Sequence, residues 1–225
     1  MMKIYQTVDK RLERTGEIAE GTWVSLTAPS PEEVRQVAAT LDIEPADLQA
    51  ALDPEESARV SLEDGYTVII VDVPVQVPDK GVGVYTTIPL GILLTQQTIT
   101  TVCAVDSQVL QDFAALRVRE FSTRKKMRFV YQIMNRAAMM YQQELRLIDR
   151  RRQEIEKNLS GAMRDSDLIE LHALESTLVY FATSLRANST VLDRLTRYKR
   201  LEQYPDDMEL LDDVIVEMRQ AIEMT

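Results

Sequence analysis

Large apolar residues recur every three or four positions through most of the second half of the chain, which is the spacing of one face of an α-helix. A first stripe comprises Val130, Met134, Ala137, Tyr141, Leu145, Ile148, Ile155 and Leu159. A second stripe comprises Leu168, Leu171, Leu174, Leu178, Phe181, Leu185, Leu192 and Leu195. Only Arg152 interrupts the first stripe, and polar residues around Gly161 separate the two. We therefore predict two long helices that lie antiparallel as a hairpin.

A third helical pattern follows Pro205 and reaches the end of the sequence. Its apolar positions, three or four residues apart, are Leu211, Val214, Met218, Ala221 and Thr225. Asp206 or Asp207 is well placed to cap this helix at its start. No glycine, proline or cluster of basic residues marks its end. We expect a truncated helix that continues in the natural protein.

The first half of the chain alternates between strand-like and helix-like patterns. Residues 30–42 predict a helix with Ser30 as N-cap, Pro31 at the first helical position and Glu33 completing a capping box. A short helix is predicted directly after it, over residues 44–53. Runs of β-branched and aromatic residues predict strands at 3–8, 22–29, 65–78, 82–95 and 98–105.

Short turns, around residues 79–81 and 96–97, join the last three of these strands, so we expect them to pair antiparallel. The predicted fold class is therefore an α/β (α+β) domain over residues 1–121, with a mixed sheet flanked by helices. The long antiparallel helical hairpin and the truncated C-terminal helix follow over residues 122–225.

Charge is unevenly distributed along the chain. Residues 1–121 hold 19 acidic and 9 basic residues, a net charge of −10, whereas residues 122–225 hold 17 of each. Such a surface repels phosphate groups and argues against nucleic-acid binding. The apolar runs are far shorter than the ~20 residues that span a bilayer. The single cysteine, Cys103, cannot form an internal disulfide, so we predict a soluble chain compatible with a reducing compartment.

Two stretches resemble the cytoplasmic portion of the CorA family of divalent-cation channels. The first is TWVSLTAPSPEEV, with Trp23, Leu26, Pro29 and Glu33. The second is LDIEPADLQAALDPEESARV, with Leu41, Ile43, Leu48, Leu52, Asp53, Glu56 and Arg59. The strand YTVIIVDVPV follows at the expected place, and the resemblance covers essentially the whole chain.

The resemblance implies that the final helix is the start of a stalk helix that continues into the first membrane span. Neither that span nor the Gly-Met-Asn motif that follows it in the family is present in this sequence. It also implies a regulatory, Mg²⁺-sensing domain on the cytoplasmic side of the cell membrane. The full-length protein would be a homopentamer that takes up Mg²⁺, with Co²⁺ or other divalent cations as further substrates, and not an enzyme.

In the family, regulatory Mg²⁺ is held by carboxylates of the stalk helix and of a neighbouring subunit's α/β domain. By position, Asp213 matches the stalk carboxylate. The usual partner position is occupied by Ala50, and Asp53, three residues further on, can substitute for it or simply terminate the short helix. Asp212 and Glu217 neighbour Asp213 and are further candidate ligands. One or two carboxylates suffice because Mg²⁺ prefers oxygen ligands and retains several waters.

Two other functions remain open from the sequence. The chain can be a soluble helical scaffold or adaptor that oligomerises through its hairpin without a metal. An enzyme is less favoured, because no glycine-rich phosphate loop follows a strand and no nucleophile lies beside a base. His172 and Cys103 stand on separate segments and make a poor zinc site, so we expect His172 to be ordinary helix surface.

Overall fold

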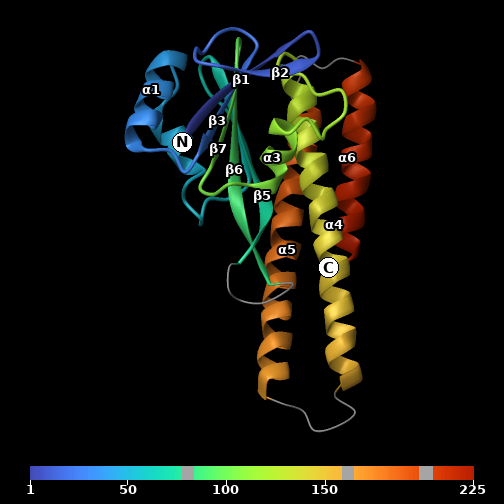
Figure 1. The fold of residues 1–225 in the computed structure, drawn as a ribbon. Coiled ribbons are helices and arrows are strands. Elements are labelled where there is room, and N and C mark those ends of the chain that lie inside the picture. Colours follow the sequence, from blue (N-terminus) through green and yellow to red (C-terminus); the bar gives the residue numbers. More distant parts are fainter. Residues whose placement is uncertain (78–83, 159–164, 198–204) are drawn as a thin grey trace.

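A mixed β-sheet lies between a small helical layer and a large one in the computed structural model, which describes residues 1–77, 84–158, 165–197 and 205–225 (Figure 1). The strands are β1 (Met2–Val8), β2 (Arg11–Thr15), β3 (Thr22–Thr27), β4 (Arg59–Leu62), β5 (Tyr66–Gln76), β6 (Tyr85–Thr95) and β7 (Ile99–Cys103). The helices are α1 (Pro31–Leu41), α2 (Pro45–Ala50), α3 (Gln108–Ala114), α4 (Lys126–Asn158), α5 (Asp165–Arg197) and α6 (Pro205–Glu223). The predicted fold class is confirmed.

The sheet has the strand order β2-β1-β3-β7-β6-β5-β4. The pairs β5–β6 and β6–β7 are antiparallel, as the short turns predicted, whereas β3 and β7 are parallel. This mixture places residues 22–27 directly beside residues 99–103 in the centre of the sheet. The predicted turn at residues 79–81 lies outside the described residues.

Helix α1 begins as the sequence predicts. The Ser30 side chain accepts the backbone N–H of Glu33, and the Glu33 carboxylate accepts the Ser30 N–H at 2.8 Å. The second predicted helix is shorter than expected, because α2 ends at Ala50 and turns follow it. Strands β2 and β4 and helix α3 were not predicted. Each has seven residues or fewer, which is too short for a clear periodic signal.

The two faces of the sheet belong to two hydrophobic clusters. Helices α1 and α2 cover one face, and this cluster contains Val34, Val37, Leu48 and Ala51 with the strand residues Val24, Leu26, Val68, Ile70 and Leu93. The other face packs against α3, α4 and α5 in a larger cluster, to which α6 also contributes from the far side of the hairpin. This larger cluster includes residues from both predicted parts of the chain, so the division at 121/122 stays a prediction.

Helices α4 and α5 lie antiparallel, which confirms the predicted hairpin (Figure 1). All described members of the first stripe are buried; its last member, Leu159, and the turn at Gly161 lie outside the described residues. In the second stripe, Leu174, Phe181, Leu185, Leu192 and Leu195 are buried and Leu171 and Leu178 are partly buried, but Leu168 is 50% exposed. Helix α6 packs against α4 and α5 and buries the hairpin face that does not meet the sheet.

The predicted cap of α6 is wrong. The helix begins at Pro205, so Asp206 and Asp207 lie inside its first turn and not before it. Asp207 is only 2% exposed, and its carboxylate accepts Arg128 Nη1 at 3.4 Å, which ties α6 to α4. The apolar positions of α6 are buried as predicted except Thr225, which follows the helix and is exposed.

Candidate metal site

Two of the candidate carboxylates of α6, those of Asp212 and Asp213, lie away from its apolar face. Leu211, Val214 and Met218 are buried against the hairpin, so the intervening positions are left at the surface. Asp212 and Asp213 are exposed there, on the second and third turns of the helix. The packing of α6 therefore presents oxygen ligands to solvent on a rigid element.

A row of acids at intervals of four residues runs along α6 through Glu209, Asp213 and Glu217. Like charges at this spacing are neighbours on a helix and destabilise it by a few tenths of a kcal/mol per pair. A divalent cation near this row relieves that repulsion and takes carboxylate oxygens as ligands. Glu209, which is exposed, was missed by the sequence analysis, although its spacing from Asp213 was visible in the sequence.

Glu217 is less free to bind a cation than its neighbours. It is partly buried, and the Gln142 side chain of α4 donates to its backbone carbonyl at 3.0 Å and to its Oε2 at 2.7 Å. Arg146 in turn donates to the Gln142 side-chain oxygen at 3.0 Å. One carboxylate oxygen of Glu217 is therefore occupied, whereas Asp213 is exposed and one turn away.

Asp53 lies in the turn that follows α2. Its Oδ1 accepts the Glu55 N–H at 3.0 Å, and its own N–H donates to the Ala50 carbonyl at 3.1 Å. Ala50 itself packs, partly buried, against the cluster formed with α1 and α2. Asp53 thus stabilises the local turn, as the sequence allowed, and its carboxylate is exposed.

Asp53 and Asp213 belong to opposite layers of the molecule. The segment of Asp53 covers one face of the sheet, whereas α6 belongs to the layer on the other face. Asp53 and Asp213 of the same chain therefore cannot bind the same ion. In the described ranges, no group of three or more His, Cys, Asp or Glu side chains is arranged to hold a metal. The carboxylate oxygens of α6 suit Mg²⁺ but supply only part of its ligands. Waters or a second chain would supply the others.

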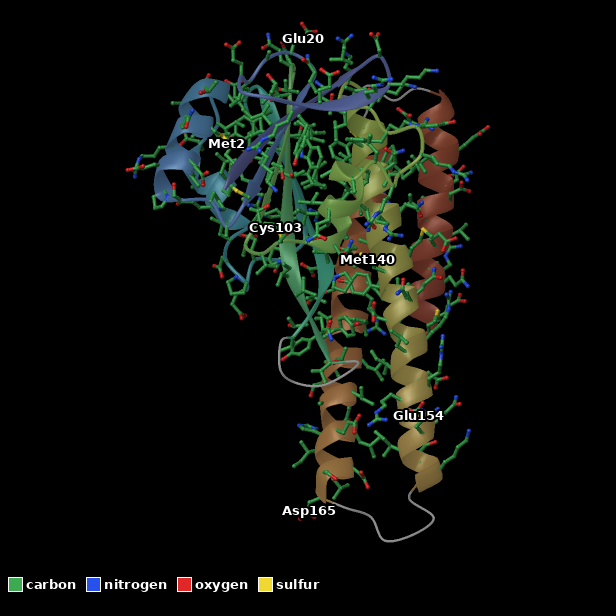
Figure 2. The ribbon with its side chains drawn as sticks, in the orientation of Figure 1. Met2, Glu20, Cys103, Met140, Glu154 and Asp165 are labelled. Atoms are coloured by element: carbon green, nitrogen blue, oxygen red, sulfur yellow. The ribbon has the colours of Figure 1, made fainter. Side chains whose placement is uncertain are left out.

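The two soft ligand types are far from forming a site. Cys103 is buried in β7 (Figure 2), and burial raises the pKa of its thiol to about 11. The His172 side chain is 80% exposed on α5, with Glu175 3.6 Å away. His172 is therefore ordinary helix surface, as expected.

Comparison with known proteins places this geometry in a family. Residues 19–225 match the model of the CorA-like Mg²⁺ transporter protein family. The cobalt/magnesium transport protein CorA of Methanocaldococcus jannaschii is 26% identical over 212 residues, which is 90% of this chain and 64% of that protein. The chain thus spans somewhat less than two thirds of the length of this curated relative.

Solved structures show the same fold. The complete structure of the CorA magnesium transporter from M. jannaschii matches with a TM-score of 0.87 and 24% identity, over 100% of this chain and 71% of that one. The soluble domain of the same transporter matches with a TM-score of 0.86 and 24% identity, over 100% of this chain and 90% of that one. None of the helices described for this chain has the length and apolar character needed to cross a membrane. The family match over residues 19–225 establishes that the chain belongs to the CorA-like Mg²⁺ transporter family.

Proposed function

We propose that this chain is the Mg²⁺-sensing cytoplasmic domain of a longer, homopentameric CorA-like channel that takes up Mg²⁺ and, as a further substrate, Co²⁺. The observation that carries the proposal is the row of carboxylates on α6, of which Glu209 and Asp213 are exposed, in a chain that belongs to the CorA-like family. Its fold corresponds over its whole length to a domain described as the soluble part of such a transporter. The chain acts as a regulator and not as an enzyme.

The proposed mechanism uses the partial ligand sets on opposite layers of the chain. In a ring of copies, Asp213 and Asp212 of one chain face the α/β domain of the next, where Asp53 takes the place left by Ala50. A bound Mg²⁺ would hold two negative surfaces together by supplying the positive charge between them. When the ion leaves, repulsion between the carboxylates separates the chains. The position of α6 therefore changes with the Mg²⁺ concentration.

Intact mass and membrane fractionation of the natural gene product test the larger assignment. We expect a product several kilodaltons heavier than the 25.7 kDa of this chain that remains with the membrane fraction. Alkaline carbonate washing separates an integral protein from one that is merely adsorbed. A product of this chain's mass in the soluble fraction would contradict the proposal and favour a soluble helical scaffold.

Limited proteolysis with and without millimolar Mg²⁺ tests the proposed metal site. We expect Mg²⁺ to slow cleavage of the chain slightly, because one or two exposed carboxylates bind it weakly when no second chain completes the site. Asp213→Ala should remove this protection. Asp193→Ala, which deletes an exposed carboxylate of α5, is the matched control and should retain it. Equal protection of wild type and Asp213→Ala would exclude Asp213 from the site.

A further inference from the structure

A cavity of about 650 Å³ lies at the end of the molecule where α4 and α6 begin. The turn between β4 and β5, the turn between β6 and β7, and the first residues of both helices form its walls. Such a volume is typical of a pocket for a small organic ligand. The cavity is separate from the carboxylate row, which starts further along α6.

Three consecutive cations, Arg124, Lys125 and Lys126, line this cavity in a chain whose net charge is −10. Its acidic lining residues are Glu63 and Asp207. The Asp207 carboxylate already accepts a hydrogen bond from Arg128, and Glu63 is exposed. With three cations against two acids, the lining of the cavity is net positive, against the charge of the molecule as a whole.

The cations also stand where helix electrostatics disfavours them. Helix α4 begins at Lys126, and its first turn contains no acidic residue but carries Lys126 and Arg128. The unpaired N–H groups at a helix N-terminus bear partial positive charge, so cations there are unfavourable and acids are the usual choice. Basic residues therefore occupy a helix start where acidic ones are preferred. Such departures from local preference are typical of functional positions. Arg128 already has carboxylate partners in Glu120 and Asp207, and Lys126 donates to two carbonyl oxygens, so an anion in the cavity would act on Arg124 and Lys125, which precede the helix.

Lys126 has a second role that fixes the geometry of the wall. Its Nζ donates to the carbonyl oxygens of Thr95 and Gln96, each at 2.6 Å, and thereby holds the turn between β6 and β7 against α4. Arg124 and Lys125 are exposed. These two side chains are therefore the ones available to a ligand.

We propose that this cavity binds a small multivalent phosphate compound, a polyphosphate or a nucleotide, through Arg124 and Lys125. Phosphate oxygens take charge-assisted hydrogen bonds from arginine and lysine. An occupant of the cavity reaches the wall that Asp207 contributes at the start of α6. Binding therefore couples anion concentration to the helix that carries the candidate metal ligands. The binding step itself does not depend on the proposed transport function.

Calorimetric titration of the wild-type chain with tripolyphosphate and with ATP, both in Mg²⁺-free buffer containing EDTA, tests the proposal. The test variant is Arg124→Gln with Lys125→Gln, and the matched control is Arg35→Gln with Arg150→Gln, which removes the same charge from exposed positions on α1 and on the distal part of α4. We expect the test variant to weaken binding about tenfold or more, because two charge-assisted contacts are lost. The control should bind like wild type.

Stability separates a ligand-binding role from a structural one. Without phosphate compounds, the test variant should melt at the same temperature as wild type or slightly higher, because it removes unfavourable charge from the start of α4. Equal affinity for both probes identifies a polyphosphate site, and tighter binding of ATP identifies a nucleotide site. No heat of binding with either probe at millimolar concentration, or equal weakening in test and control variants, would overturn the proposal.

Discussion

Replacing Asn188 with alanine is expected to lower the free energy of unfolding by about 2–4 kcal/mol, because two partly buried backbone groups lose their partners. Asn188 lies on α5 and is 1% exposed. Its side-chain oxygen accepts the Asp72 N–H at 2.8 Å, and its amide nitrogen donates to the Asp72 carbonyl at 2.8 Å. The Asn188 side chain therefore makes the two hydrogen bonds that the backbone of a neighbouring strand would otherwise make.

The edge of β5 explains why this contact is needed. Strand β4 pairs with β5 only from Thr67 to Ile70, so the edge is open beyond that point. The N–H and C=O of one strand residue point to the same side, and those of Asp72 point to this open edge, where they bond Asn188, and not toward β6. Partial burial also raises the pKa of the Asp72 carboxyl. Without Asn188, the backbone of Asp72 has no partner of the same geometry.

Urea denaturation followed by circular dichroism measures this effect as a shift in the midpoint at unchanged slope. Asn188→Leu, which keeps a large side chain but no hydrogen-bonding group, should be destabilised as strongly as Asn188→Ala. Thr190→Ala, at an exposed position two residues away on the same helix, should change stability by no more than about 0.5 kcal/mol. A leucine variant as stable as wild type would show that the amide contacts are not what holds α5 to the sheet.

Replacing Trp23 with alanine is expected to cost about 3–5 kcal/mol, because it opens a large cavity in the core. Trp23 is 1% exposed, and its indole Nε1 donates to Thr101 Oγ1 at 2.9 Å. Its ring stacks on Tyr5 at 4.9 Å and meets Phe121 and Phe129 edge-on at 5.9 and 5.1 Å. These contacts join β1 and β3 to α4, so the loss affects both halves of the chain.

Thermal unfolding followed by far-ultraviolet circular dichroism checks this result without using the fluorescence of the residue that is removed. In a chain of 225 residues, a loss of this size should lower the melting temperature by about 6–20 °C. Trp23→Phe keeps part of the ring volume and should lie between alanine and wild type. A melting temperature of Trp23→Ala within 2 °C of wild type, a margin of about 1 kcal/mol, would contradict this role of the aromatic cluster.

The position of the candidate metal ligands was only partly predictable. The residue types and the spacing of Asp213 and Glu217 can be read from the sequence. The apolar stripe that sets which face of the helix is buried can be read from it as well. The hydrogen bonds from Gln142 to Glu217 are not, because they join residues of two helices that meet only in the folded chain. The same holds for the separation of Asp53 from α6, which depends on the side of the sheet that each helix covers.

The sequence by itself determined the features that rest on neighbouring residues. The capping box of α1, the buried stripe of α4 and the antiparallel pairing of β5, β6 and β7 follow from local hydrogen bonding, side-chain periodicity and short turns. Only the tertiary structure decided the parallel pairing of β3 with β7, the strand-like contact of Asn188 with Asp72, and the cationic cavity at the start of α4. Each of these brings together residues distant in sequence, and their geometry is set by packing, which no local pattern of apolar and polar positions encodes.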